Sequence, residues 1–437
     1  MRDLSWREKL GLAAGLLSIQ RFLKRTPFLS PEEMRAWQFA RLQALVAYAY
    51  DKVPFYRRLY DSASFRPEDL KGWEDFLRVP LVTKDQVIAN FPEGMLAQGY
   101  QLEDLTVSRS SGSSGKVLDI AYDPRAMTTY ILAGLRLYRM GFSYHPWHRQ
   151  VYIYTSPYPL DSLFGAYPLH FLSTLTPPEE ILKALGTLRP DLLICYPSHL
   201  KQLTKLATPE QRDKIRLRAI SVNSEMSAQA ERDELSGFWD CPVLDEYSSE
   251  ELTRIAAQCL QRTYHVFKDI NYLEVLDEAG RPTTELGTLV GTNLHNFAMP
   301  MIRYQQNDLG QIEAPGCACG WAFRRLTHLE GRRNDSFVLP SGKVLSSGFL
   351  LDATYEFLLA YRAAVRDFCL IQESPAGVLL QVVPGTGWDE TIAGNISKRF
   401  AEFLEPGVSF RIDPVAECEK TRTGKRNPII NQMTRST

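Results

Sequence analysis

The run LLICY at residues 192–196 is one of four short apolar runs in the middle of the chain; the others are VYIY at 151–154, the stretch 215–222 and VLDEY at 243–247. Helical stretches separate these runs. Short buried runs that alternate with helices are typical of a parallel sheet covered on both faces. The sequence therefore predicts an α/β fold for the large part of the chain.

The segments on either side follow other patterns. Toward the N-terminus, residues 30–33 (SPEE) predict a helix that opens with a capping box. Residues 270–313 alternate apolar and polar side chains around turn signals, which predicts a β-rich subdomain. After Asp335, a strand–turn–strand pattern, a helix and a further strand predict an α+β domain. We expect a large domain over residues 1–334 and a small C-terminal domain over 335–437.

The composition is that of a globular protein. Of the 437 residues, 44% are hydrophobic and 23% are charged, and a chain of this length predicts two or three domains. The 50 Lys and Arg residues balance 51 Asp and Glu residues, so no net charge attracts nucleic acid or an anionic membrane. Seven cysteines, an odd number, argue against a disulfide framework and predict a reducing compartment, most simply the cytoplasm.

An apolar stretch at residues 10–19 has some features of a signal peptide. It lacks a small-residue cleavage site, and Arg21, Lys24 and Arg25 follow it closely. It is also too short to span a bilayer. We expect an amphipathic helix docked on the domain and no stable membrane insertion, with attachment to a membrane surface as the alternative.

The segment Ser110-Ser111-Gly112-Ser113-Ser114-Gly115-Lys116 has the composition of a phosphate-binding loop. Its glycines let backbone N–H groups converge, its serines add hydroxyl donors, and Lys116 adds positive charge. The alternative is a flexible Ser/Gly linker. The segment is not a Walker A loop, because Ser110 and Val117 stand where that motif has Gly and Ser or Thr. A P-loop phosphotransferase is therefore disfavoured.

The segment resembles the phosphate loop of the adenylate-forming superfamily, which contains acyl-CoA synthetases, luciferases and peptide-synthetase adenylation domains. Residues 247–251 (YSSEE) are similar to that family's Tyr-Gly-x-Thr-Glu motif. This likeness implies that Tyr247 packs on adenine and that Glu251 is a catalytic carboxylate that binds Mg²⁺. The branch that the chain most resembles is that of the phenylacetate:CoA ligases and their relatives in capsule and natural-product clusters, with VPFY at 53–56 and PLVTK at 80–84 as further landmarks.

The resemblance also implies roles for residues in the second half of the chain. Asp308 would bind the ribose hydroxyls of ATP, and Arg332 would lie near the ribose. Asp335 would be the hinge about which the small domain rotates after adenylation. Lys425, in the segment TGK at 423–425, would be the catalytic lysine that bridges the acyl carboxylate and the α-phosphate.

The chain departs from the family pattern at several positions. Ser224 and Glu225, which we expect to bind ATP, follow Asn223 in a segment where the family has Gly-Ala-Glu. Glu250 stands where Thr or Ser usually contacts the nucleotide, and an extra carboxylate beside Mg²⁺ could bind a second cation or repel phosphate. These departures leave adenylation as the expected chemistry and put CoA as the acyl acceptor in question.

Cys259, His265, Cys317 and Cys319 form a candidate structural zinc site. Three thiolates and one imidazole make a closed tetrahedral ligand set. The Cys-x-Cys spacing is tighter than in most zinc motifs, but relatives in this branch carry a similar quartet. The alternative is four unrelated residues, with Cys259 buried as a small hydrophobic side chain.

Aromatic residues crowd the stretch in which this family builds part of its acyl pocket. Tyr152, Tyr154 and Phe164 are the candidate pocket residues, and an aromatic lining favours a flat aryl acid. The alternative is that these residues belong to an ordinary aromatic-rich core.

The expected function is ATP-dependent activation of a carboxylic acid, with CoA as the acyl acceptor and Mg²⁺ and a structural Zn²⁺ as metals. One alternative is an adenylating enzyme that passes the acyl group to an amine, a hydroxyl or a carrier-protein thiol. A second alternative is a non-catalytic nucleotide-binding relative. A homodimer is a further expectation, and no nucleic-acid partner is expected.

Overall fold

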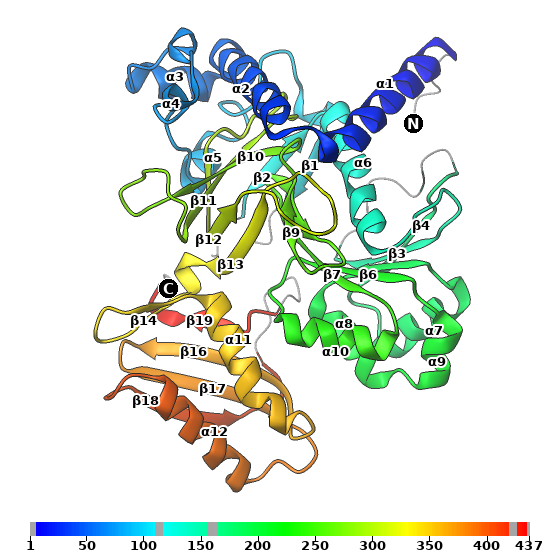
Figure 1. Cartoon of the computed structure of the whole chain (residues 1–437), viewed down its shortest axis with the longest axis vertical. Helices are drawn as coiled ribbons and strands as arrows, with labels where there is room; N and C mark the ends of the chain where they lie inside the picture. The colour runs from blue at the N-terminus through cyan, green and yellow to red at the C-terminus, as the bar shows by residue number, and fades with distance from the viewer. Residues whose placement is uncertain (1–5, 110–116, 156–161, 163–164, 419–425, 435–437) are drawn as a thin grey trace. The chain divides into compact units, whose positions relative to one another are not determined.

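The computed structural model describes residues 6–109, 117–155, 162, 165–418 and 426–434. The chain, which Figure 1 colours by residue number, divides into two compact units. The first unit comprises Met1–Met140, Glu246–Gln306 and Gln311–Thr327, and the second comprises Gly141–Asp245, Asn307–Gly310 and His328–Thr437. Each unit is described by itself.

The first unit contains the N-terminal helices. They are α1 (Trp6–Arg25), α2 (Pro31–Lys52), α3 (Pro54–Ser62), α4 (Trp73–Phe76), α5 (Lys84–Asn90) and, except for its last residue, α6 (Pro124–Gly141). The capping box of α2 is confirmed, because the Ser30 hydroxyl accepts the Glu33 N–H at 3.1 Å and the Glu33 carboxylate accepts the Ser30 N–H at 3.0 Å. Helix α1 confirms the helix expected at residues 10–19, and none of the helices in the described residues has the length and apolar character of a bilayer span.

The strands of the first unit are mainly antiparallel. They include β1 (Thr106–Arg109), β2 (Asp119–Tyr122), β8 (Thr253–Gln258), β9 (Tyr264–Val266), β10 (Asn271–Leu276) and β11 (Gly287–Asn293). Strand β1 pairs with β2, β8 with β9, and β10 with β11, each pair antiparallel. The β-rich subdomain predicted at residues 270–313 is therefore confirmed. Three more strands have residues in both units: β7 (Val243–Ser249), β12 (Tyr304–Glu313) and β13 (Arg325–Arg332).

A buried ion pair lies in the core of the first unit. The Arg136 guanidinium on α6 donates two hydrogen bonds, of 2.7 and 2.6 Å, to the carboxylate of Asp269, which is fully buried. The Thr26 hydroxyl, just after α1, donates to the same carboxylate, and the ring of Phe267 lies 4.8 Å from the guanidinium carbon. These contacts connect the end of α1 to α6 and to the segment between β9 and β10.

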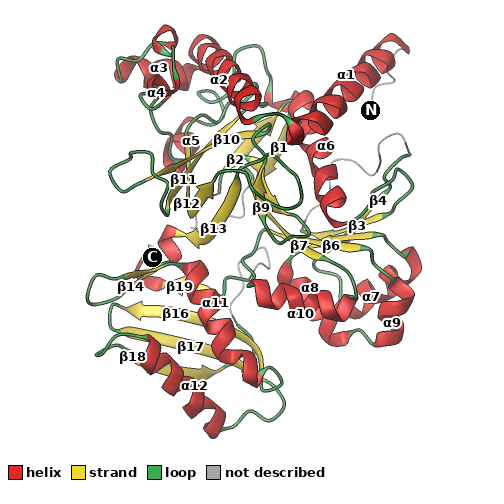
Figure 2. Ribbon diagram, in the orientation of Figure 1, coloured by secondary structure: helices red, strands yellow, loops and turns green. Residues whose placement is uncertain are grey.

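The second unit contains the parallel sheet that the four apolar runs predict. Its strands β3 (Gln150–Tyr154), β4 (Leu169–Ser173), β5 (Leu192–Cys195) and β6 (Ala219–Asn223) are parallel and lie in the order β6-β5-β3-β4. Helices α7 (Pro178–Leu188), α8 (Pro197–Leu206), α9 (Pro209–Ile215) and α10 (Gln229–Trp239) pack against these strands through one apolar cluster (Figure 2). The α/β fold is confirmed.

One of the four runs is shorter as a strand than its apolar pattern predicted. Residues 215–222 were expected to be one extended run, but Ile215 ends helix α9 and strand β6 begins only at Ala219. Arg216 adopts a left-handed conformation, with φ of 55°, and its N–H donates to the Arg212 carbonyl at 2.8 Å. This C-terminal cap ends the helix inside the apolar run.

The C-terminal part of the second unit is α+β, as predicted. Its four-stranded sheet has the order β18-β17-β16-β19, formed by β16 (Val365–Ser374), β17 (Gly377–Pro384), β18 (Ser409–Pro414) and β19 (Ile429–Asn431). Helices α11 (Ser347–Leu358) and α12 (Glu390–Phe403) cover this sheet (Figure 2), and the short strands β14 (Phe337–Val338) and β15 (Val344–Leu345) pair beside it. The domain boundary at Asp335 stays a prediction.

The ion pair in the first unit generates a stability prediction. Asp269→Asn removes the negative charge and leaves the Arg136 guanidinium buried without a counter-charge, which should lower the free energy of unfolding by about 3–5 kcal/mol. Urea denaturation measures this loss. Asp277→Asn is the matched control, because the Asp277–Arg281 pair is exposed and the change should be small. Equal losses in the two variants would contradict the importance of the buried pair.

Candidate functional site

The hairpin of β1 and β2 flanks the predicted phosphate loop, because residues 110–116 lie in the connection between these strands. Where the strands end, the Arg109 guanidinium donates two hydrogen bonds, of 2.7 and 2.9 Å, to the Asp119 carboxylate. The loop residues themselves (Ser110, Ser111, Gly112, Ser113, Ser114, Gly115 and Lys116) lie outside the described residues. Their binding of phosphate stays a prediction.

Two hydrogen bonds attach this hairpin to the turn that carries Glu250 and Glu251. The Ser108 hydroxyl on β1 donates to the Glu250 carboxylate, and the Tyr122 hydroxyl on β2 donates to the Glu250 backbone carbonyl. The turn joins the antiparallel strands β7 and β8. The structure therefore brings the flanks of the predicted phosphate loop and the predicted Mg²⁺-binding turn together within the first unit.

The Glu251 carboxylate is buried, with 9% of the residue exposed, and it accepts a hydrogen bond of 2.9 Å from the Tyr304 hydroxyl. A hydroxyl is a neutral donor, so this contact orients the carboxylate without neutralising it. A carboxylate held in this way fits a hard cation such as Mg²⁺. Tyr247 lies four residues before it, near the end of β7, and faces Ala256 of β8.

The second unit places Ser224 beside one of the two described tyrosines proposed for the acyl pocket. Ser224 follows β6 in a left-handed conformation, with φ of 67°, and its Oγ lies 2.5 Å from the Tyr154 hydroxyl. The Tyr154 hydroxyl also donates to the Asn223 side chain, and the Tyr154 ring stacks on Tyr152, with centroids 4.3 Å apart. A residue expected to bind ATP and one residue expected to line the acyl pocket thus meet at the carboxyl ends of parallel strands, and Tyr152 stacks on the latter from within β3.

Glu225 has contacts that the sequence did not predict. Its carboxylate accepts the Ser198 N–H and the Ser198 hydroxyl, both at 3.0 Å, at the start of helix α8. It also accepts the backbone N–H of Arg426 at 2.8 Å. Burial raises the pKa of Glu225, while these hydrogen bonds favour its ionised form. The proposed contact of Glu225 with ATP stays a prediction.

Arg426 is the residue that the sequence analysis missed. It follows Lys425 directly, only 9% of it is exposed, and its guanidinium donates to Asp367 at 2.8 Å. Its position next to the Thr-Gly-Lys segment was the only signal in the sequence, because nothing local indicates that this arginine is buried. Lys425 lies outside the described residues.

The remaining predicted nucleotide and hinge residues lie in the second unit. Asp308 is partly buried in β12, directly after Asn307, whose φ is 61°. Arg332 is exposed at the end of β13, and Asp335 ends a short 3₁₀ helix, Arg333–Asp335. Gly331, which precedes Arg332 in β13, has φ of 70°, and a Cβ there would lie 2.4 Å from the Ser347 hydroxyl oxygen, so this position needs glycine. The nucleotide and hinge roles of Asp308, Arg332 and Asp335 stay predictions.

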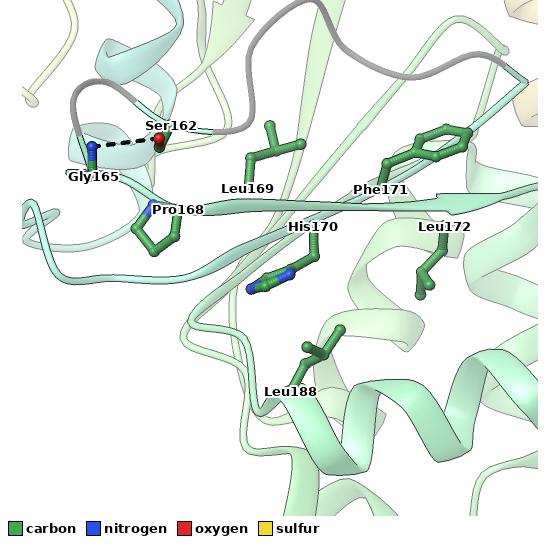
Figure 3. Close-up of a pocket in the computed structure, with 8 residues that line it drawn as sticks. All are labelled: Ser162, Gly165, Pro168, Leu169, His170, Phe171, Leu172 and Leu188. Carbon is green, nitrogen blue, oxygen red and sulfur yellow. Dashed lines mark hydrogen bonds between the residues drawn. The ribbon is translucent and has the colours of Figure 1, made fainter.

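A hollow of about 600 Å³ lies along strand β4 in the second unit. It is lined by Ser162, Gly165, Pro168, Leu169, His170, Phe171, Leu172 and Leu188. Figure 3 shows Leu169 and Phe171 on one side of the strand and His170 and Leu172 on the other, so the hollow follows the strand edge. Tyr152 and Tyr154 are not among its lining residues, and Phe164 lies outside the described residues. The acyl pocket stays a prediction.

The four proposed zinc ligands come together in the first unit. Cys259 follows β8, His265 lies on β9, and Cys317 and Cys319 lie between β12 and β13. The ligand atoms all lie within 4.8 Å of one another, and the sulfur atoms of Cys259 and Cys317 are 3.6 Å apart. Tetrahedral zinc with Zn–S bonds of about 2.3 Å separates two sulfurs by about 3.8 Å. Burial lowers the pKa of His265 to about 4, so its imidazole is neutral at pH 7, as a metal ligand must be.

Known proteins with related sequences are phenylacetate-coenzyme A ligases. The Thermus thermophilus enzyme is 27% identical over 338 residues, which cover 71% of this chain and 73% of that enzyme. The Escherichia coli enzyme is 27% identical over 337 residues, covering 73% of this chain and 75% of that enzyme. No protein-family model matches the sequence.

Solved structures with the same fold include acyl-CoA ligases. A 2-hydroxyisobutyryl-CoA ligase in a postadenylation state has a TM-score of 0.79 and 21% identity, covering 94% of this chain and 92% of that one. A benzoate CoA ligase from Burkholderia xenovorans has a TM-score of 0.53 and 16% identity, covering 75% and 68%. The chain is therefore a homologue of phenylacetate-coenzyme A ligases with the fold of the adenylate-forming acyl-CoA ligases, as its motifs predicted.

Proposed function

We propose that this protein is an AMP-forming carboxylate ligase that activates an acid with ATP and then forms a CoA thioester. The observation that carries this proposal is the pair of hydrogen bonds from the β1–β2 hairpin to Glu250. They hold the flanks of the Ser/Gly-rich loop next to the turn that also carries the buried carboxylate of Glu251. A triphosphate group with bound Mg²⁺ would need a phosphate-binding loop and a carboxylate close to each other. The relatives, all ligases of CoA by name, support the same chemistry.

The first step joins two anions. A carboxylate oxygen of the acid attacks the α-phosphorus of ATP, the bond between the α-phosphorus and its bridging oxygen breaks, and pyrophosphate leaves. Catalysis of this step depends on neutralising and positioning negative charge. Residues 110–116 would hold the leaving pyrophosphate, Lys425 would bridge the carboxylate and the α-phosphate, and Mg²⁺ bound by Glu251 would screen the phosphate oxygens.

The second step transfers the acyl group. The sulfur of CoA attacks the acyl carbonyl, the bond between that carbon and the phosphate oxygen breaks, AMP leaves and the thiol proton passes to solvent. An aromatic acid is supported by the stacked rings of Tyr152 and Tyr154, whose stack ends at the Ser224 hydroxyl. An amine, a hydroxyl or a carrier-protein thiol is the alternative acceptor, and a non-catalytic nucleotide-binding protein is the alternative without chemistry.

We also propose that the quartet of Cys259, His265, Cys317 and Cys319 binds a structural Zn²⁺. Three thiolates and one imidazole leave no coordination position for a substrate, which favours a structural role over a catalytic one. The site would connect the β8–β9 hairpin to the loop before β13. The cytoplasmic location and the homodimer stay predictions.

The proposed reaction can be tested with a panel of acids. Purified protein should release pyrophosphate from ATP with aryl acids such as phenylacetate and benzoate, and product should accumulate only when CoA is present. Adding 2-hydroxyisobutyrate tests for an aliphatic preference. Pyrophosphate release that CoA does not accelerate would favour another acceptor, and no release with any acid would favour the non-catalytic alternative.

Lys425→Ala should lower the rate of ATP–pyrophosphate exchange by about 100- to 1,000-fold while ATP still binds, because one charged group at the transition state is lost. Isothermal titration with ATP and the exchange assay measure the two properties. Lys398→Ala, which removes an exposed lysine on α12, is the matched control and should exchange at the wild-type rate. Near-normal exchange by the Lys425 variant would refute its assignment.

Elemental analysis should find about one zinc ion per chain. Cys317→Ser should lose the metal and unfold at a lower temperature, because binding free energy contributes to folding. Cys241→Ala, which truncates a buried core cysteine, should keep the metal. Undamaged wild-type protein without zinc would remove the site.

A further inference from the structure

The Glu225 carboxylate lies between two backbone segments that are far apart in the sequence. On one side it accepts two hydrogen bonds from Ser198, at the start of helix α8. On the other side it accepts the N–H of Arg426, which is 201 residues away in the sequence. A carboxylate that accepts three hydrogen bonds at 2.8–3.0 Å fixes the position of each donor. One of those donors belongs to the residue that directly follows the predicted catalytic lysine.

The side chain of Arg426, like its backbone N–H, fixes the position of this residue. Its guanidinium donates to the Asp367 carboxylate at 2.8 Å and to the Phe368 carbonyl at 3.1 Å, and it lies over the Phe368 ring at 4.9 Å. A further carboxylate, Glu231 on α10, lies 3.9 Å away. Burial alone would lower the pKa of Arg426, but Asp367, Glu231 and Glu225 raise it, so the side chain stays charged.

A lysine adds a second positive charge beside the carboxylates that surround this arginine. Lys201 on α8 lies 3.0 Å from Glu231 and 3.9 Å from Asp367. Glu231 is 96% buried, and the two nearby cations keep its pKa low against the effect of burial. We name Lys201, Glu225, Glu231, Asp367 and Arg426 the Arg426 cluster.

The contacts on either side of the Arg426 cluster are also polar. The Lys205 ammonium on α8 donates to the Arg366 carbonyl at 2.6 Å, and the Tyr355 hydroxyl on α11 donates to Glu234 on α10. Buried polar and ionic contacts add little net free energy, because their partners lose contacts with water on burial, although the loss of one charged partner destabilises the fold. Their directionality instead fixes a specific geometry. A cluster of this kind is therefore better suited to positioning a segment than to stabilising the fold.

We propose that Glu225 and Arg426 are positioning residues for acyl-adenylate formation, because they hold the chain at the C-terminal end of segment 419–425. This inference rests on the proposed function and deepens it. Glu225 would then act on the reaction through the backbone of the lysine segment, although its motif alone suggested a nucleotide contact. Arg426 would have the same role through its side chain, because the pairing of its guanidinium with Asp367 also fixes the position of this residue.

The two half-reactions should depend differently on these residues. Adenylation brings an anionic carboxylate to an anionic phosphate, so it needs a correctly placed ammonium group. Thioester formation is an attack on the carbonyl of a mixed anhydride and needs no cation between two anions. A displacement of about 1 Å at a catalytic group can cost about 100-fold in rate. Loosening the end of the lysine segment should therefore slow the first step and leave the second step nearly unchanged.

The test measures both half-reactions for Arg426→Met and Arg426→Lys. The first is ATP–pyrophosphate exchange with phenylacetate, or with the panel acid that wild-type protein activates fastest. The second is thioester formation from the synthetic acyl-adenylate of that acid and CoA. Arg426→Met should lose about 100-fold in exchange and less than about threefold in thioester formation. Arg426→Lys, which keeps a cation beside Asp367, should recover part of the exchange rate.

The controls separate this proposal from its alternatives. Arg411→Met removes an exposed arginine of β18 that pairs with Glu373, and both half-reactions should stay at the wild-type rate. Equal losses in both half-reactions for both Arg426 variants would show a purely structural role and overturn the proposal, as would unchanged exchange in Arg426→Met. Absence of exchange in the wild-type protein, with every acid of the panel, would instead refute the proposed function.

Discussion

The ion pair between the buried guanidinium of Arg426 and Asp367 is the interaction on which the position of residue 426 in the second unit depends. A charge removed from water needs an opposite charge and hydrogen bonds in a defined geometry, so Arg426 can occupy only one position. Its backbone N–H is then directed at Glu225, which in turn fixes the start of α8. One buried cation thereby determines where Arg426, the first described residue after the predicted catalytic lysine, lies relative to the end of strand β6.

The parallel sheet determines which residues can meet. Strands β3, β5 and β6 run in the same direction, so the side chains that follow them gather at one edge, the usual place for a ligand in an open α/β sheet. Tyr154 and Ser224 illustrate this, since they are 70 residues apart in the sequence and 2.5 Å apart in space. The first unit uses a different device, in which an antiparallel hairpin is hydrogen-bonded to a turn through Glu250.

The hydrogen bonds between the hairpin and the turn explain why a glutamate can stand at position 250, where the family usually has Thr or Ser. An extra carboxylate beside a magnesium ligand would repel the phosphate groups of ATP if the carboxylate pointed toward them. The Glu250 carboxylate instead accepts the Ser108 hydroxyl, at the end of the strand that precedes the loop. Glu250 therefore serves as a link between the two segments, while Glu251 accepts a hydrogen bond from Tyr304.

The sequence by itself determined the elements and the class of chemistry, because these depend on neighbours along the chain. The capping box at Ser30, the four apolar runs and the order of the motifs are all local patterns, and the resemblance to phenylacetate:CoA ligases followed from them. Only the tertiary structure decided that Glu225 contacts residue 426, that Arg426 is buried, and that the four zinc-ligand candidates converge. Burial and pairing across 201 residues depend on how strands and helices pack, and an exposed and a buried arginine look identical in a sequence.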